Sequence, residues 1–204
     1  MTLRVLAVLA AAACVVVPAA RADGDPASDF LLSQSTFLPF DAKIPKETAD
    51  RLNALVADAK DKGYTIRIAV IATRFDLGAV PSLWLKPQTY ARFLGQELFF
   101  VYKGRLLVVM PNGYGVSRGG KLLPSAQRVV DALPKPGAGG GALVVAAMRA
   151  VRRLAARESI TVAVPAAGSG SSATSDRIVI AAIAGGVVLL LLAGYGARRL
   201  LTRE

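Results

Sequence analysis

Two apolar runs without charged residues lie near the two ends of the chain. The residues between them alternate between apolar and polar positions, so the two runs and the middle of the chain predict different kinds of segment. The first covers residues 5–17, follows Arg4, and is followed by the small-x-small pattern Ala20-Arg21-Ala22. This layout predicts a secretory signal peptide over residues 1–22. The alternative is a retained transmembrane helix, for which the run is short.

The second apolar run begins at Ile178 and ends at Ala197. At about 1.5 Å per residue it matches the hydrocarbon thickness of a bilayer. We therefore expect a transmembrane helix over residues 177–198, in contact with the lipid bilayer. A buried core helix is the alternative, but core helices rarely stay apolar on every side over such a length. Arginines in residues 199–204 predict a cytoplasmic tail, because positive charge favours the cytoplasmic side.

Together these segments predict a single-pass protein of the cell membrane, with its N-terminal domain outside and its C-terminus in the cytoplasm. Residues 165–176 are rich in Gly, Ser and Ala, which predicts a flexible linker. Residues 23–164 then form one extracytoplasmic domain, large enough for a hydrophobic core. Small residues four positions apart in the apolar segment, such as Ala182 and Gly186, would also permit a homodimer.

Between residues 23 and 164 the hydrophobic positions follow helical and strand periods in turn. Residues 44–62 place four apolar residues on one helical face, whereas residues 65–73 are β-branched and alternating, as in a strand. The same patterns predict helices over residues 88–99, 125–133 and 142–157, and strands over residues 105–110, 114–117 and 160–164. Asn112-Gly113 predicts a tight turn. The predicted fold class is α/β: a single small domain with a mixed sheet covered by helices.

The composition limits the chemistry open to the chain. It contains no His and one Cys, which excludes Ser-His-Asp and Cys-His catalysis, imidazole metal ligands and an internal disulfide. The one cysteine, Cys14, lies within the predicted signal peptide. We therefore favour a protein that is not an enzyme, and we predict no catalytic and no cofactor-binding residue.

The chain is strongly basic, and one group of its cations is patterned. The net charge is +11, of which residues 23–164 carry +7. Helical spacing over residues 142–157 puts four arginines on the face opposite the apolar one: Arg149, Arg152, Arg153 and Arg157. They predict a surface that binds anionic lipid headgroups or an anionic polymer, with an ordinary solvated face as the alternative. No nucleic-acid partner is expected, because no aromatic platform accompanies the charge.

Three weaker motifs receive structural interpretations. Residues 115–121 match the G-x-x-x-x-G-K spacing of a phosphate-binding loop, but Leu122 stands where a magnesium-binding Ser or Thr is required. We interpret the segment as a Gly-rich turn, in which Ser117 and Lys121 form no catalytic Ser-Lys pair. The acidic residues Asp23, Asp25 and Asp29 predict a frayed, solvated terminus rather than a calcium loop.

Six short motifs within residues 36–155 together carry a family resemblance. They are Phe40-Asp41, the helix of residues 46–62, the strand of residues 66–71, Tyr90-Ala-Arg-Phe, Gly104-Arg-Leu-Leu-Val-Val109 and Gly113-Tyr114-Gly115. In these the chain resembles the TPM-domain family, which includes a thylakoid photosystem-repair phosphatase-like protein and many bacterial membrane proteins. The resemblance implies an α/β fold and a divalent-metal site, with Ca²⁺ as the cofactor and Asp41 and Asp76 as its ligands. Most of the family's other acidic ligands have no counterpart here.

These observations leave three functions open. The first is a non-enzymatic, membrane-anchored extracytoplasmic domain that binds a partner such as an envelope protein. The second is binding of an anionic polymer or of lipid headgroups through the basic helix. The third is a weak divalent-metal-dependent phosphatase, which only the family resemblance implies.

Overall fold

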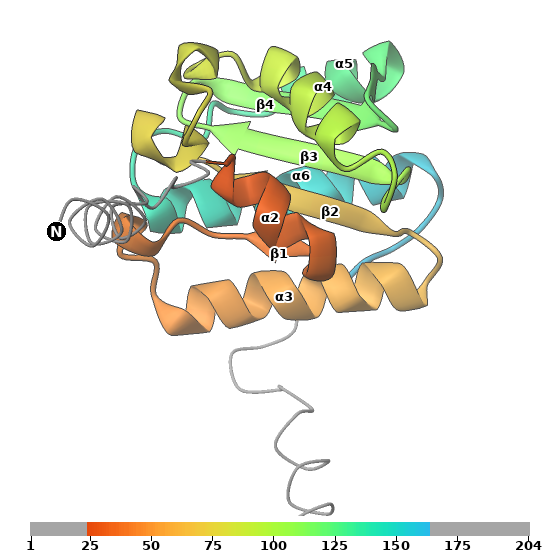
Figure 1. The fold of residues 1–204 in the computed structure, drawn as a ribbon. Coiled ribbons are helices and arrows are strands. Elements are labelled where there is room, and N and C mark those ends of the chain that lie inside the picture. Colours follow the sequence, from red (N-terminus) through yellow and green to blue (C-terminus); the bar gives the residue numbers. More distant parts are fainter. Residues whose placement is uncertain (1–23, 164–204) are drawn as a thin grey trace, which may run out of the picture.

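Residues 24–163 are the part of the chain that the computed structural model describes, and they form three layers, a sheet between two layers of helices (Figure 1). The elements in chain order are α2 (Pro26–Ser33), β1 (Thr36–Phe37), η1 (Phe40–Ala42), α3 (Lys46–Asp61), β2 (Ile66–Val70), η2 (Arg74–Leu77), η3 (Pro81–Leu83), α4 (Pro87–Glu97), β3 (Arg105–Met110), β4 (Gly113–Arg118), β5 (Lys121–Leu122), α5 (Pro124–Asp131) and α6 (Gly140–Arg157). This arrangement confirms a small α/β domain with a mixed sheet and helices on both faces.

The five strands follow one another across the sheet in chain order. β1, β2 and β3 are parallel, and β4 and β5 are antiparallel additions joined by tight turns. α3 connects β1 to β2, and α4 connects β2 to β3, but the two helices cover opposite faces of the sheet. Both connections lead to the next strand in the same direction across the sheet, but their helices lie on opposite faces. Two such connections must have opposite handedness. One of the two is therefore left-handed, which is rare.

The sheet separates two hydrophobic cores. On one face, alternate residues of β2 and β3 pack against α3, α5 and α6. On the other face, the intervening residues pack against α2 and α4. Leu107 and Val109 point into the first core, and Leu106, Val108 and Met110 into the second. Residues 24–163 thus contain both faces of the sheet and the helices that cover them, so we expect a fragment of residues 23–164 to fold.

A buried polar pair joins the N-terminal helix to the second core. Asp25 caps α2 by accepting from the Ala27 N–H at 3.3 Å, and both its carboxylate oxygens lie within 2.9 Å of the Tyr90 hydroxyl of α4. Tyr90 is fully buried, and the Asp25 residue is only 6% exposed. The prediction of a frayed, solvated terminus is therefore wrong from Asp25 onward, because this carboxylate finds a buried hydroxyl donor. Burial also raises the pKa of the Tyr90 hydroxyl above its ordinary value.

Most predicted elements are confirmed, and β3 has the predicted bounds. The strand predicted over residues 160–164 is wrong over its described part, residues 160–163, which form no strand. These residues run beside α3 instead: the carbonyl of Thr161 accepts from Lys62, and the N–H of Ala163 donates to Asp58. Side chains of α3 thus take the hydrogen bonds that a sheet would have provided.

Several predicted segments lie outside the described residues. They are the signal peptide (1–22), the linker (165–176), the transmembrane segment (177–198) and the tail (199–204). Among residues 24–163, no helix combines the length and the apolar character needed to cross a bilayer.

Replacing Gly115 by alanine tests the close approach of α4 to β4. A Cβ atom at Gly115 would lie 2.0 Å from the Pro87 carbonyl oxygen, so Gly115→Ala must move backbone. We expect a loss of about 2 kcal/mol or more in the free energy of unfolding. Gly141→Ala is the control: its Cβ meets only Pro45 Cδ, at 3.7 Å, and we expect a helix gain of about 0.5 kcal/mol. Equal effects in denaturant titrations would contradict this account.

The Asp25–Tyr90 pair predicts a pH dependence of stability. Burial raises the pKa of Asp25 from 3.8 to about 6, although the Tyr90 hydrogen bond opposes the shift. Between these values the folded state keeps a proton that the unfolded state has released. The contribution of Asp25 to stability is therefore complete below about pH 4 and falls as pH rises to about 6, by about 3 kcal/mol.

Asp25→Asn removes this titration and retains a capping oxygen. The stability difference, wild type minus variant, is expected to fall between pH 4 and pH 7. Denaturant unfolding at a series of pH values measures it, and a constant difference would show that Asp25 does not titrate in this range.

Candidate anion-binding site

The four arginines of the predicted basic face project from the outer side of α6. The helix buries its apolar face against β2, β3, α3 and α5, which leaves the opposite side in solvent. All four arginines are exposed, as their helical spacing predicts. We call them the arginine face: Arg149, Arg152, Arg153 and Arg157.

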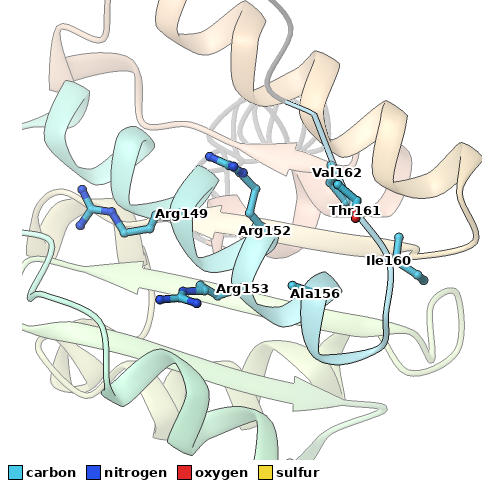
Figure 2. A pocket seen from close by; sticks show the side chains of 7 residues that line it. All are labelled: Arg149, Arg152, Arg153, Ala156, Ile160, Thr161 and Val162. Carbon is cyan, nitrogen blue, oxygen red and sulfur yellow. The ribbon is translucent and has the colours of Figure 1, made fainter.

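Two hollows flank the arginine face. The first lies between α6 and the segment that follows it, has a volume of about 320 Å³, and includes Arg149, Arg152 and Arg153 in its lining (Figure 2). Ala156, Ile160, Thr161 and Val162 complete that lining. The second hollow, about 450 Å³, lies between α6 and α5 and is lined by Val129, Ala132, Leu133, Arg153, Ala156 and Arg157. Both volumes fall in the range of small-ligand sites. The hollows share Arg153 and Ala156, so they adjoin across the helix.

The positive charge of this surface is not neutralised by the domain itself. Within residues 24–163, none of the four arginines takes part in an ion pair. No carboxylate lines either hollow. Two acidic side chains near the ends of α3 and α6 are already paired, Asp58 with Lys62 at 2.8 Å and Glu158 with Arg105. An anion entering the hollows would therefore meet free guanidinium donors.

The two residues implied as metal ligands have different surroundings. Asp41 lies in η1 and is exposed, and its carboxylate makes no hydrogen bond or ion pair within the described residues. Asp76 Oδ2 accepts from the N–H groups of Ala72 and Thr73, at 2.8 and 2.7 Å, as part of a capping box on η2. No cluster of three or more acidic or cysteine side chains with a metal-binding arrangement occurs among residues 24–163. The structure thus gives Asp76 a role in holding its own turn.

The Gly-rich segment is a β-hairpin, as interpreted from the sequence. Gly119 and Gly120 have φ values of 53° and 74° and form the turn between β4 and β5. Ser117 is fully buried, and its hydroxyl donates to the Ala91 carbonyl at 2.6 Å. Its hydroxyl is therefore occupied by backbone, and Lys121 is exposed on the short edge strand.

Sequence reasoning found the arginines but missed the walls of their site. Ile160, Thr161 and Val162 belong to the segment predicted as a strand, and α5 was not placed beside α6. The apolar residues at 160 and 162 were the available signal, since they lie close in sequence to the helix end.

Comparison with known proteins identifies no relative: no family model, curated protein or solved structure matches the chain. The resemblance to the TPM-domain family therefore stays a prediction.

Alanine substitutions separate the roles of the two aspartates. Asp76→Ala removes an acceptor for two N–H groups, so we expect a loss of about 1 kcal/mol in unfolding free energy. Asp41→Ala, at an exposed position without partners, should change stability by less than about 0.5 kcal/mol. Thermal and denaturant unfolding measure both. A larger loss for Asp41→Ala would indicate an interaction of this carboxylate that the description of η1 does not include.

Proposed function

We propose that the protein is a membrane-anchored, extracytoplasmic binding domain without a catalytic role, which holds an anionic envelope polymer on its arginine face. One observation carries the proposal: four exposed, unpaired arginines border two adjoining hollows that no carboxylate lines. The anchor and the location outside the cell rest on the predicted signal peptide and the apolar segment of residues 177–198.

The chemistry of the face suits phosphate groups. A guanidinium presents planar paired donors, which match two oxygens of a phosphate and remain charged at any physiological pH. Charge-assisted hydrogen bonds of this kind are roughly twice as strong as neutral ones. Ala156, Ile160 and Val162 also line the first hollow, so it offers apolar surface for the carbon skeleton between phosphates.

The shape of the face favours an extended ligand over a flat bilayer. From Arg149 to Arg157 the helix advances about 12 Å, so the guanidiniums form a row. The charges stand at hollows rather than on a protrusion, and no exposed aromatic side chain accompanies them. A polymer with repeated phosphates can follow such a row, whereas a planar lipid surface cannot enter the recesses.

Binding of inorganic polyphosphate tests the proposal on residues 23–164. In Arg152→Ala/Arg153→Ala two neighbouring guanidiniums are lost, and we expect the affinity to fall about tenfold or more. The slope of log affinity against log salt should become shallower by roughly 1.5 to 2, because two fewer counterions are released. Fluorescence anisotropy of labelled polyphosphate at several salt concentrations measures both quantities.

The matched control is Arg74→Ala/Arg92→Ala. These arginines are exposed in η2 and α4, on the opposite side of the sheet, and their loss changes the net charge equally. Equal weakening by both double variants would mean that only net charge matters, and the proposed site would be wrong. Binding to anionic vesicles that Arg152→Ala/Arg153→Ala abolishes, without binding to polyphosphate, would reassign the ligand of the arginine face to lipid headgroups. Saturable Ca²⁺ binding abolished by Asp41→Ala, together with phosphate-ester hydrolysis, would establish the phosphatase alternative instead.

A further inference from the structure

Three consecutive apolar side chains stand in solvent at the turn between α4 and β3. Phe99 is 40% exposed, Phe100 93% and Val101 62%. The rings of Phe99 and Phe100 contact edge to face, with centroids 5.9 Å apart. We call these three residues the apolar tip. Isolated exposed hydrophobic residues are ordinary, but an adjacent group of this size marks an interaction surface.

The turn that carries the apolar tip is fixed by hydrogen bonds and by contacts with the core. Leu98 is fully buried in the second core, and its carbonyl accepts from the N–H groups of Val101 and Tyr102, at 3.0 and 2.7 Å. The Tyr102 hydroxyl donates to the Arg105 carbonyl at 2.8 Å, and the guanidinium of Arg67 lies 4.2 Å from the Tyr102 ring centroid. The exposed rings are therefore presented by an ordered turn rather than by a free end.

Basic side chains lie on the Phe99 side of the apolar tip, and the exposed Glu97 ends α4 just before it. Lys103 Nζ lies 4.6 Å from the centroid of the Phe99 ring. The β4–β5 turn is beside the same ring, because a Cβ atom at Gly119 would lie 3.8 Å from it. Arg118 and Lys121, which flank that turn, are exposed. Exposed apolar side chains beside several cations are complementary to an anionic lipid surface, whose acyl chains and phosphates accept the two kinds of group.

The tip also lies at the end of the sheet where α6 finishes, since Glu158, which follows α6, pairs with Arg105 at the start of β3. β2 and β3 both begin at this end, since they are parallel and the tip precedes β3. Lys62, which precedes β2, donates a hydrogen bond to the Thr161 carbonyl. One turn earlier in α3, Asp58 accepts from the N–H of Ala163, the last described residue. The described chain therefore ends beside α3, one helical turn back from this end of the sheet.

Exposed phenylalanines also occur at the other end of the sheet, where the guanidinium of Arg74 lies 5.5 Å from the centroid of the Phe75 ring. Phe40 and Phe75 follow β1 and β2, so they lie at the ends where the parallel strands finish. Each is directly followed by an aspartate, Asp41 or Asp76. Phe75 is therefore an exposed ring with a neighbouring cation at the opposite end of the sheet, and it serves as the control position.

We propose that the apolar tip inserts into the anionic bilayer that anchors the chain, with Lys103, Arg118 and Lys121 on the lipid phosphates. This contact uses the anchor of the proposed function but a different surface from the arginine face. It fixes the orientation of the domain, and it leaves the arginine face open along the side of the molecule.

Site-specific fluorescence on the full chain tests the insertion. In a Cys14→Ser background, Phe100→Cys and Phe75→Cys each carry the polarity-sensitive dye NBD, and the protein is reconstituted into vesicles of phosphatidylcholine and phosphatidylglycerol. We expect a blue shift at position 100 and quenching by lipids with spin-labelled acyl chains, at least twofold greater than at position 75. Equal, weak quenching at both positions would overturn the proposal.

Vesicle binding by the fragment of residues 23–164 separates this proposal from the previous one. Phe100→Ser should weaken binding to phosphatidylglycerol vesicles about tenfold, the order expected for one buried phenylalanine. Phe75→Ser is the matched control and should leave it unchanged, with circular dichroism confirming that both variants fold. Arg152→Ala/Arg153→Ala should weaken polyphosphate binding without changing the NBD shift at position 100. Unchanged vesicle binding by Phe100→Ser would contradict insertion whatever the polyphosphate result.

Discussion

The complete burial of β3 on both of its faces is the constraint on which the rest of the structure depends. From Leu106 to Met110 every residue is at most 1% exposed, and successive side chains enter opposite cores. A strand of this kind requires helices on both faces of the sheet. The inner sides of α3, α4 and α6 are therefore buried against the sheet. Within residues 24–163, surfaces for binding therefore lie on the outer sides of helices, at the sheet edges and at the turns beyond the strand ends, and these include the arginine face and the apolar tip.

The second face of β3 is closed by a short helix that has little hydrophobic surface of its own. α2 buries only Ala27 and Leu31 completely. Its position is set by polar contacts: Asp25 with the Tyr90 hydroxyl, and Arg67 with the Leu31 carbonyl. Such contacts add directional specificity to a weak apolar interface. Because Asp25 is buried in this interface, the stability of the fold depends on whether its carboxyl group is protonated.

Sequence reasoning succeeded where one element carries a long regular pattern. α3, α6 and β3 follow from periodicity because each buries a full face or both faces. α2 was missed because it is two turns long and because aspartates near a terminus ordinarily indicate solvent. The opposite hands of the two crossovers have no local signal at all. The arginines were predictable from helical spacing, but the hollows were not, since their walls come from α5 and from residues 160–162.

The two proposed surfaces differ in shape, and the difference decides what each can bind. Guanidiniums beside recesses gain from a ligand that enters the recesses, whereas exposed rings on a protruding turn lose hydration only when something soft covers them. A helix face and a strand end of one sheet point in different directions, so occupation of one does not block the other. In the proposed arrangement a tether and an inserting tip with neighbouring cations would act on the same membrane, and linked weak contacts multiply in affinity. The arginine face would then point sideways, parallel to the membrane plane, where an envelope polymer lying above the membrane can reach it.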